Sequence, residues 1–213
     1  MAGLFEKDFR LLMQRKQILM LFFIIAIILG FSQESTFILG YLPFCTVLVT
    51  VSTISYDELD HGYEFLMTLP ITTKNYVTEK YLFCISGAGI SWLIAIFLYF
   101  MSNIIHGNTH SFFAEFSVIF AYLPIALTML SILIPFQLKY GVEKSRIILV
   151  TLAGAILAAG YFIINLMDKN STLLNTINSI SDEIAEIILF AFGILITLIS
   201  YCASNQIMKK KGF

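Results

Sequence analysis

Long stretches without charged residues dominate the pattern of polar and apolar positions along the chain. Asp, Glu, Lys and Arg are all absent from residues 17–33, 35–56, 81–114, 116–138, 147–167 and 187–208. A helix needs about 20 apolar residues to cross a bilayer, so each stretch is long enough or nearly so. The stretch 81–114 is too long for one helix, and we expect its span to end near Ser102 because polar residues follow.

This pattern predicts an all-α, polytopic membrane protein in which residues 1–213 form a single transmembrane domain. Six helices would cross the membrane, at about 17–33, 35–56, 81–102, 114–138, 147–167 and 185–204. A further apolar stripe within 168–184 predicts a short amphipathic helix at the outer leaflet, just before the sixth span.

Composition agrees with this interpretation. Hydrophobic residues make up 58% of the chain and charged residues 13%, whereas soluble domains have about 45–50% and about 25%. The net charge of −1 leaves no basic excess that could neutralise phosphates, which argues against a nucleic-acid partner.

The basic residues predict the orientation of the chain in the membrane. With six spans, both termini and two internal loops share one side, and that side carries all the Lys and Arg residues except Lys169. Because loops rich in Lys and Arg stay in the cytoplasm, we expect both termini to be cytoplasmic.

Residues 1–16 predict an amphipathic helix in the cytoplasmic interface of the membrane. Its apolar face and its polar face hold, respectively, Leu4, Phe5, Phe9 and Leu12, and Glu6, Lys7, Arg10 and Gln14. Two roles remain open for this helix: a simple anchor beside the membrane, or a lever that senses a cytoplasmic partner.

The predicted cytoplasmic loop 57–80 carries the clearest pattern between spans. Apolar residues recur at helical spacing and acidic residues cluster among them, namely Tyr56, Leu59, Tyr63 and Leu66, and Asp57, Glu58, Asp60 and Glu64. Leu69-Pro70 should end this helix, because the residue before proline avoids helical angles, and Thr72 or Thr73 can cap the next helix. The loop is either a solvated acidic segment or a helix–turn–helix that passes force into spans two and three.

The predicted spans offer little chemistry of their own. The absence of charged residues from their middle argues against a proton-driven transporter and against an intramembrane hydrolase. A phosphate-binding G-x-x-x-x-G-K-[ST] loop is also absent, so energy for uphill transport has to come from another subunit. Thr46, Thr50 and Thr53 share one face of the second span; their hydroxyls either bond to the preceding helical turn or line a cavity for cargo.

The segment from Tyr56 to Tyr81 resembles small bacterial ABC-2-type transporter permeases, which are also described as type V exporter-like. The family motif has an acidic stretch, a Leu-Pro-Ile turn with small polar residues and a Lys at the start of span three. Its counterparts are Asp57, Glu58 and Glu64, then Leu69, Pro70, Ile71, Thr72 and Thr73, then Lys80. The interfacial N-terminal helix, the six spans and the amphipathic outer segment match the family layout as well.

The resemblance implies a homodimeric permease in the bacterial plasma membrane that pairs with two copies of a separate ABC ATPase. ATP and Mg²⁺ would bind to that partner, so the chain itself would be no enzyme and would hold no cofactor or metal. A coupling helix from about Asp57 to Leu69 would dock on the ATPase through Asp57, Glu58, Asp60, Tyr63, Glu64, Leu66, Leu69 and Pro70.

Within that family, the chain is similar to permeases that export amphipathic peptides such as phenol-soluble modulins, or that give immunity to bacteriocins. The expected function is therefore ATP-driven export of amphipathic or antimicrobial peptides or other hydrophobic cargo. An alternative from another class is a membrane sensor or assembly component that binds a cytoplasmic regulator without transporting anything.

Overall fold

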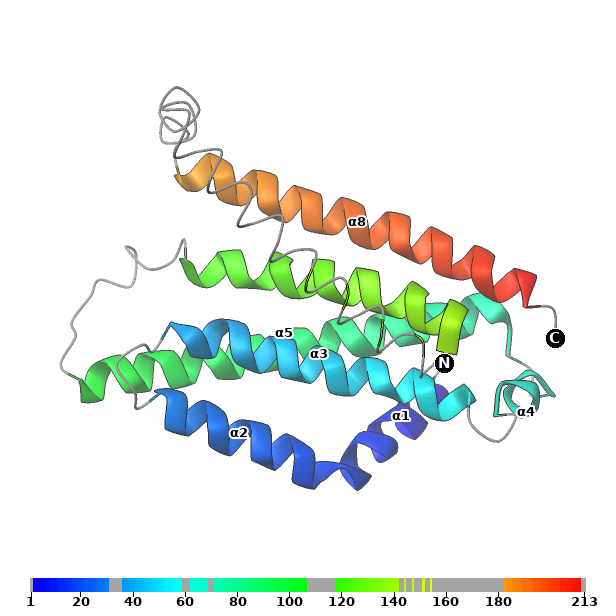
Figure 1. The fold of residues 1–213 in the computed structure, drawn as a ribbon, viewed down its shortest axis with the longest axis horizontal. Coiled ribbons are helices and arrows are strands. Elements are labelled where there is room, and N and C mark those ends of the chain that lie inside the picture. The colour runs from blue at the N-terminus through cyan, green and yellow to red at the C-terminus, as the bar shows by residue number, and fades with distance from the viewer. Residues whose placement is uncertain are drawn as a thin grey trace.

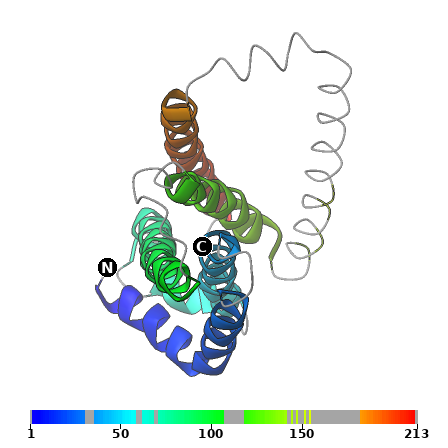
Figure 2. The same ribbon diagram turned by 90° about the vertical axis from the view of Figure 1, so that its left-hand side faces the viewer.

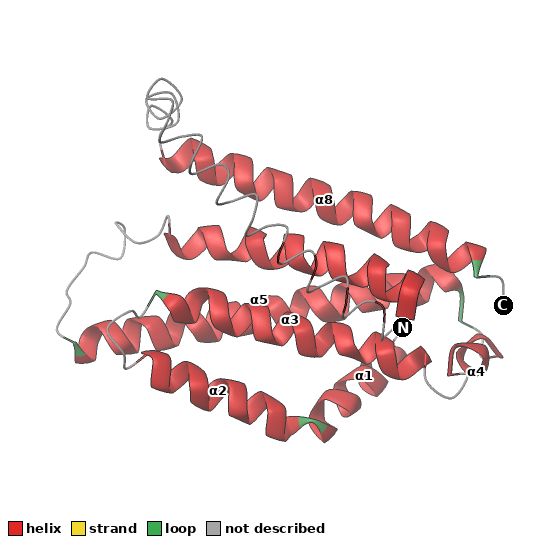
Figure 3. Ribbon diagram, in the orientation of Figure 1, coloured by secondary structure: helices red, strands yellow, loops and turns green. Residues whose placement is uncertain are grey.

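The fold was obtained as a computed structural model of the full chain. It describes residues 2–30, 36–58, 62–68, 71–106, 118–141, 144, 147, 151, 154 and 182–211. Within these ranges the chain is helical apart from short connections, and they contain no strand (Figure 3). This confirms the predicted all-α class.

Seven helices carry the described part of the chain apart from positions 144, 147, 151 and 154, which are helical as well. They are α1 (Ala2–Gln14), α2 (Lys16–Gly30), α3 (Phe37–Glu58), α4 (Gly62–Thr68), α5 (Thr73–Ile105), an unlabelled helix Val118–Gly141, and α8 (Asp182–Lys210). Of the predicted spans, 147–167 lies outside the described residues except at positions 147, 151 and 154, and the predicted outer amphipathic helix does so up to residue 181.

Four of these helices are long and apolar enough to cross a membrane, namely α3, α5, Val118–Gly141 and α8. The pair α1 and α2 would make a fifth span if counted together, but a bend of 66° separates their axes at Arg15. α2 alone has 15 residues, so it is short for a complete span.

The third predicted span is part of a much longer helix. α5 begins at Thr73 and runs for 33 residues without a break. Thr72 caps it as the sequence predicts, because its extended backbone lets the side chain accept a hydrogen bond from the Asn75 amide at 3.2 Å.

α3 packs along α5 at the centre of the structure, and the other helices lie on either side of this pair. Both views place α1 and α2 on one side and α8 on the other (Figures 1 and 2). The two helices approach closely at Gly87, where a Cβ atom would lie 2.8 Å from a methyl group of Thr50. α4 and the two chain ends lie toward the same end of the molecule (Figure 1).

Large apolar side chains cover much of the outer surface. Leu93, Phe97, Ile187 and Leu198 each expose 61% or more of their area. A bilayer solvates such side chains as well as a protein core does, so this surface fits a chain embedded in lipid.

Candidate coupling site and apolar pocket

A buried group of four charged residues joins α1, α3 and α5. Lys80 is fully buried, and its ammonium binds Asp8 Oδ2 and lies 2.7 Å from Asp57 Oδ2. Lys7 Nζ lies 2.5 Å from Asp57 Oδ1 and 3.4 Å from Asp8 Oδ1. We call Lys7, Asp8, Asp57 and Lys80 the ion cluster.

Neutral side chains complete the coordination of the ion cluster. The Tyr76 hydroxyl donates a hydrogen bond to Asp57 Oδ2 at 2.9 Å, and Thr53 Oγ1 lies 3.3 Å from Asp8 Oδ2. The two carboxylates and two ammonium groups also balance in charge. Burial of charges is expensive unless they are paired and hydrogen-bonded. Every charge of the ion cluster is paired, and among its carboxylate oxygens Asp8 Oδ1 has no hydrogen bond in the described part of the chain and only the ion pair with Lys7.

The ion cluster gives the N-terminal helix a role that its surface pattern did not predict. Lys7 was expected on the solvated face of α1, yet it reaches Asp57 at the end of α3. Asp8 and Leu4 are both buried against the bundle. α1 is therefore fixed to the same ends of α3 and α5 that hold the loop between them.

The predicted coupling helix is shorter than the range from Asp57 to Leu69. Asp57 ends up in the last turn of α3, where Lys80 and Lys7 hold it, and the separate helix α4 starts only at Gly62. A Cβ atom at Gly62 would lie 2.6 Å from the backbone oxygen of Asp57. Gly62, the first residue of α4, therefore lies against the last turn of α3.

α4 is anchored to the bundle through its apolar side. Tyr63 and Leu66 are 6% and 8% exposed. The Tyr63 ring meets the Tyr76 ring edge-on, with centroids 5.8 Å apart, and Lys211 Nζ lies 5.0 Å from its centre. Burial, together with the negative charges of Asp57 and Glu58, raises the pKa of Tyr63, so its hydroxyl stays protonated.

The remaining residues of the predicted coupling set fall in different places. Glu58 lies against Gly141, where a Cβ atom would meet its carboxylate at 2.5 Å. Glu64 lies within α4. Asp60, Leu69 and Pro70 lie outside the described residues.

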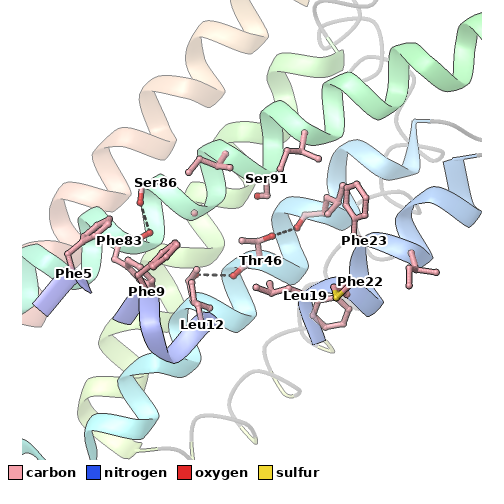
Figure 4. Close-up of a pocket in the computed structure, with 17 residues that line it drawn as sticks. Phe5, Phe9, Leu12, Leu19, Phe22, Phe23, Thr46, Phe83, Ser86 and Ser91 are labelled. Atoms are coloured by element: carbon pink, nitrogen blue, oxygen red, sulfur yellow. Dashed lines mark hydrogen bonds between the residues drawn. The ribbon is translucent and has the colours of Figure 1, made fainter. Parts of the chain in front are cut away.

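A pocket of about 530 Å³ opens between α1, α2, α3 and α5 (Figure 4). Its wall is almost entirely apolar and includes three side chains from one face of α1, namely Phe5, Phe9 and Leu12. The Phe5 ring meets the Phe83 ring of α5 edge-on at 5.1 Å. α1 thus contributes one face to the pocket wall and another to the ion cluster.

The threonine stripe of α3 divides between the pocket and the ion cluster. Thr46 and Thr50 line the pocket, whereas Thr53 lies beside Asp8 and is absent from the described pocket wall. All three hydroxyls also donate to backbone oxygens one turn earlier, at 2.8–3.0 Å. The two open interpretations of the stripe are therefore compatible, since the methyl groups remain available to a cavity.

Several residues of the site were missed by the sequence analysis, which assigned no role to Asp8 or Tyr76. A signal for Asp8 was present, because it stands four residues after Leu4 and four before Leu12, inside the apolar face of α1. An acid in the middle of an apolar helix face predicts a buried partner. Lys80 was noted only through the family motif.

Comparison with known proteins places the chain in a family. A family model described as ABC-2 family transporter protein matches residues 3–209. No curated protein and no solved structure matches the chain. Since the match covers nearly the whole length and the described helices suit a bilayer, the chain belongs to the ABC-2 transporter family, as a multi-pass membrane permease component that associates with an ABC ATPase.

Proposed function

We propose that the chain is the membrane-spanning subunit of an ATP-driven exporter in the bacterial plasma membrane. Two copies of the chain pair with two copies of an ABC ATPase, which binds ATP and Mg²⁺. Both termini and α4 face the cytoplasm, in keeping with the distribution of Lys and Arg.

The anchoring of α4 is the observation that carries this proposal. A short helix that receives force from a partner needs a stiff connection to the spans that move. Tyr63 and Leu66 supply this connection, because both side chains are buried against the bundle. The Tyr63 ring also contacts the ring of Tyr76, which is a residue of α5. Buried aromatic contacts of this kind are close-packed and transmit displacement.

The ion cluster extends the connection from α4 to α1. Asp57 lies in the last turn of α3, before the segment that leads to α4, and Lys80 joins it to Asp8. A displacement of α4 therefore moves α1 together with α3 and α5. Because α1, α3 and α5 form three walls of the pocket and move together, the same displacement changes the shape of the pocket against its fourth wall, α2.

The lining of the pocket supports an amphipathic or hydrophobic cargo, such as an antimicrobial peptide. Apolar groups of the cargo can pack against a wall that consists mainly of Phe, Leu, Ile and Met side chains without losing hydrogen bonds. Thr46 and Thr50 add methyl groups whose hydroxyls are already bonded to α3 itself.

The proposal is tested by reconstituting the chain with the ABC ATPase that co-purifies with it. We expect cargo-dependent ATP hydrolysis in proteoliposomes, and no uphill transport by the chain alone. Glu64→Lys should weaken ATPase binding and lower this hydrolysis. Glu6→Lys is the matched control, since Glu6 is exposed on α1 and bonds only within its own helix, to Arg10 at 2.6 Å, among the described contacts. Equal activity of Glu64→Lys and Glu6→Lys would contradict the coupling role of α4, as would co-purification of a kinase or protease instead of an ATPase.

A further inference from the structure

A second pocket, of about 380 Å³, lies between the helix Val118–Gly141 and the first turns of α8. Its described wall contains Phe120, Phe190 and Glu186, and otherwise only alanine and isoleucine side chains. It lies toward the end of α8 that is remote from α4 and from the ion cluster (Figure 1). None of the coupling interactions described above involves these residues.

Glu186 places a carboxylate in this apolar wall. Its Oε1 atom is buried and has no hydrogen-bond partner in the described part of the chain. A carboxylate with one oxygen shielded from water and without a donor among the described residues gains from a nearby cation, because its charge is only partly compensated. Ionisable groups within membrane helices commonly mark binding sites for this reason.

The two phenylalanines suit a cation as well. The face of an aromatic ring attracts a cation within about 6 Å. The Phe120 ring is held in place by Trp92, which meets it edge-on with centroids 5.5 Å apart and donates from Nε1 to the Ile119 oxygen at 3.1 Å. The aromatic wall beside Glu186 is therefore preformed.

The charges of the predicted outer side favour the same kind of ligand. The segments assigned to that side contain one base, Lys169, and four acids, namely Glu34, Asp168, Asp182 and Glu183, and Glu115 and Glu186 lie in the first turns of the spans that begin there. Such an excess of one sign raises the local concentration of the opposite ion.

We propose that the pocket at Glu186 binds a hydrophobic organic cation, that is, an ammonium or guanidinium group attached to an apolar body. The carboxylate and the two rings take the charge, and the alanine and isoleucine side chains take the apolar body. The shared chemistry fits either a soluble cation or the ammonium of a phospholipid headgroup. This inference does not depend on the proposed coupling role of α4.

The single tryptophan of the chain makes the proposal directly measurable. Trp92 touches the ring of Phe120, so occupation of the pocket should change its fluorescence. The purified full-length protein, in nanodiscs of phosphatidylglycerol, is titrated with benzyltrimethylammonium and, separately, with neopentylbenzene, its uncharged carbon analogue. We expect saturable binding of the cation and at least several-fold weaker binding of the neutral analogue.

Glu186→Gln keeps the size of the side chain and removes its charge, so it should weaken binding of the cation by about tenfold or more. Glu183→Gln removes the same charge about one turn earlier in α8 and should bind like the wild type. Phe190→Leu should also weaken binding while leaving the charge in place. Equal affinity of the wild type and Glu186→Gln would overturn the proposal, and so would equal affinity for the two compounds.

A second arm of the experiment distinguishes the two sources of the cation. Nanodiscs that contain phosphatidylethanolamine are compared with nanodiscs of phosphatidylglycerol alone. If phosphatidylethanolamine weakens binding of the added cation in the wild type but not in Glu186→Gln, the lipid headgroup is the occupant. If the lipid leaves the affinity for the added cation unchanged, the occupant is a soluble cation. A reduction in affinity that is equally large in Glu186→Gln would count against a site at this carboxylate.

Discussion

The ammonium of Lys80 lies 2.7 Å from the carboxylate of Asp57, and both side chains are almost completely buried. The contact joins α5 to the last turn of α3, beside the loop that leads to α4. With Asp8 on the other side of Lys80, the ion pairs that join α1 to α3 and to α5 meet at a single point.

Removal of Lys80 should be strongly destabilising. In Lys80→Met, Asp8 and Asp57 would remain buried with only Lys7 to balance them, and breaking a buried ion pair in this way costs about 3–5 kcal/mol. Thermal unfolding of the purified protein, followed by Trp92 fluorescence, should show a clearly lower midpoint. The double variant Lys80→Met/Asp8→Asn restores the charge balance and should recover part of the loss. A double variant no more stable than the single one would refute the role of charge balance.

Gly62→Ala should disturb the position of α4. The new Cβ atom would lie 2.6 Å from the Asp57 oxygen, so the backbone has to shift, at a cost of about 1–3 kcal/mol. We expect weaker stimulation of the ATPase partner in proteoliposomes. Gly89→Ala is the matched control, because its added Cβ would meet no atom within 4 Å beyond the backbone of α5 around it, and α5 continues on both sides. Unimpaired coupling in Gly62→Ala would show that the close approach of α4 to α3 has no role in it.

Two substitutions at Thr46 should show whether transport depends on its hydroxyl or on the free volume of the pocket beside it. Thr46→Val keeps the shape of the side chain and loses only a hydrogen bond within α3, to the Leu42 oxygen at 2.9 Å, so transport should continue. Thr46→Phe adds a ring to the pocket wall and should inhibit transport while basal ATP hydrolysis remains. Both variants are measured in transport assays. Reduced transport by Thr46→Val would show that the hydroxyl is needed for transport. Normal transport by Thr46→Phe would exclude the pocket as the path of the cargo.

A cross-link between α1 and α5 should test whether the two helices move together. The rings of Phe5 and Phe83 touch at 5.1 Å between centroids, so cysteines at these positions can be joined by a short bis-methanethiosulfonate reagent, which forms a disulfide with each of them and spans more than a direct bond would. Cys45, Cys84 and Cys202 are first replaced by alanine or serine. Because the ion cluster already joins α1 to α5, the cross-link should leave transport unchanged, and its reduction by dithiothreitol should have no effect. Loss of transport that dithiothreitol restores would show that α1 moves separately.

The helices themselves were predictable because each depends on local sequence. Uncharged stretches of sufficient length predicted α3, α5, Val118–Gly141 and α8, and Thr72 was recognised as a cap by residue type and position. Helix ends were less accurate. α5 begins eight residues before the predicted span, at Thr73 instead of 81, because Lys80 is buried in protein and does not need to reach water.

The ion cluster was not predictable because its members are distant in sequence. Lys80 and Asp8 are 72 residues apart, and periodicity shows which face a residue occupies but not which other helix that face meets. Charged residues at the ends of apolar stretches also have the same pattern whether they are solvated or paired. Only the packing of α1 across α3 and α5 distinguishes these cases.

The length of α5 has a mechanical consequence. Thirty-three residues of helix extend about 50 Å at about 1.5 Å per residue, whereas the hydrocarbon layer is about 30 Å thick. About two fifths of this rod therefore lies beyond the hydrocarbon, and the helix contains no proline and continues unbroken from Thr73 to Ile105. A sideways push on its protruding end makes the whole rod pivot, so its far end swings in the opposite direction. A movement produced on one face of the membrane thus reaches the other face without any intermediate joint.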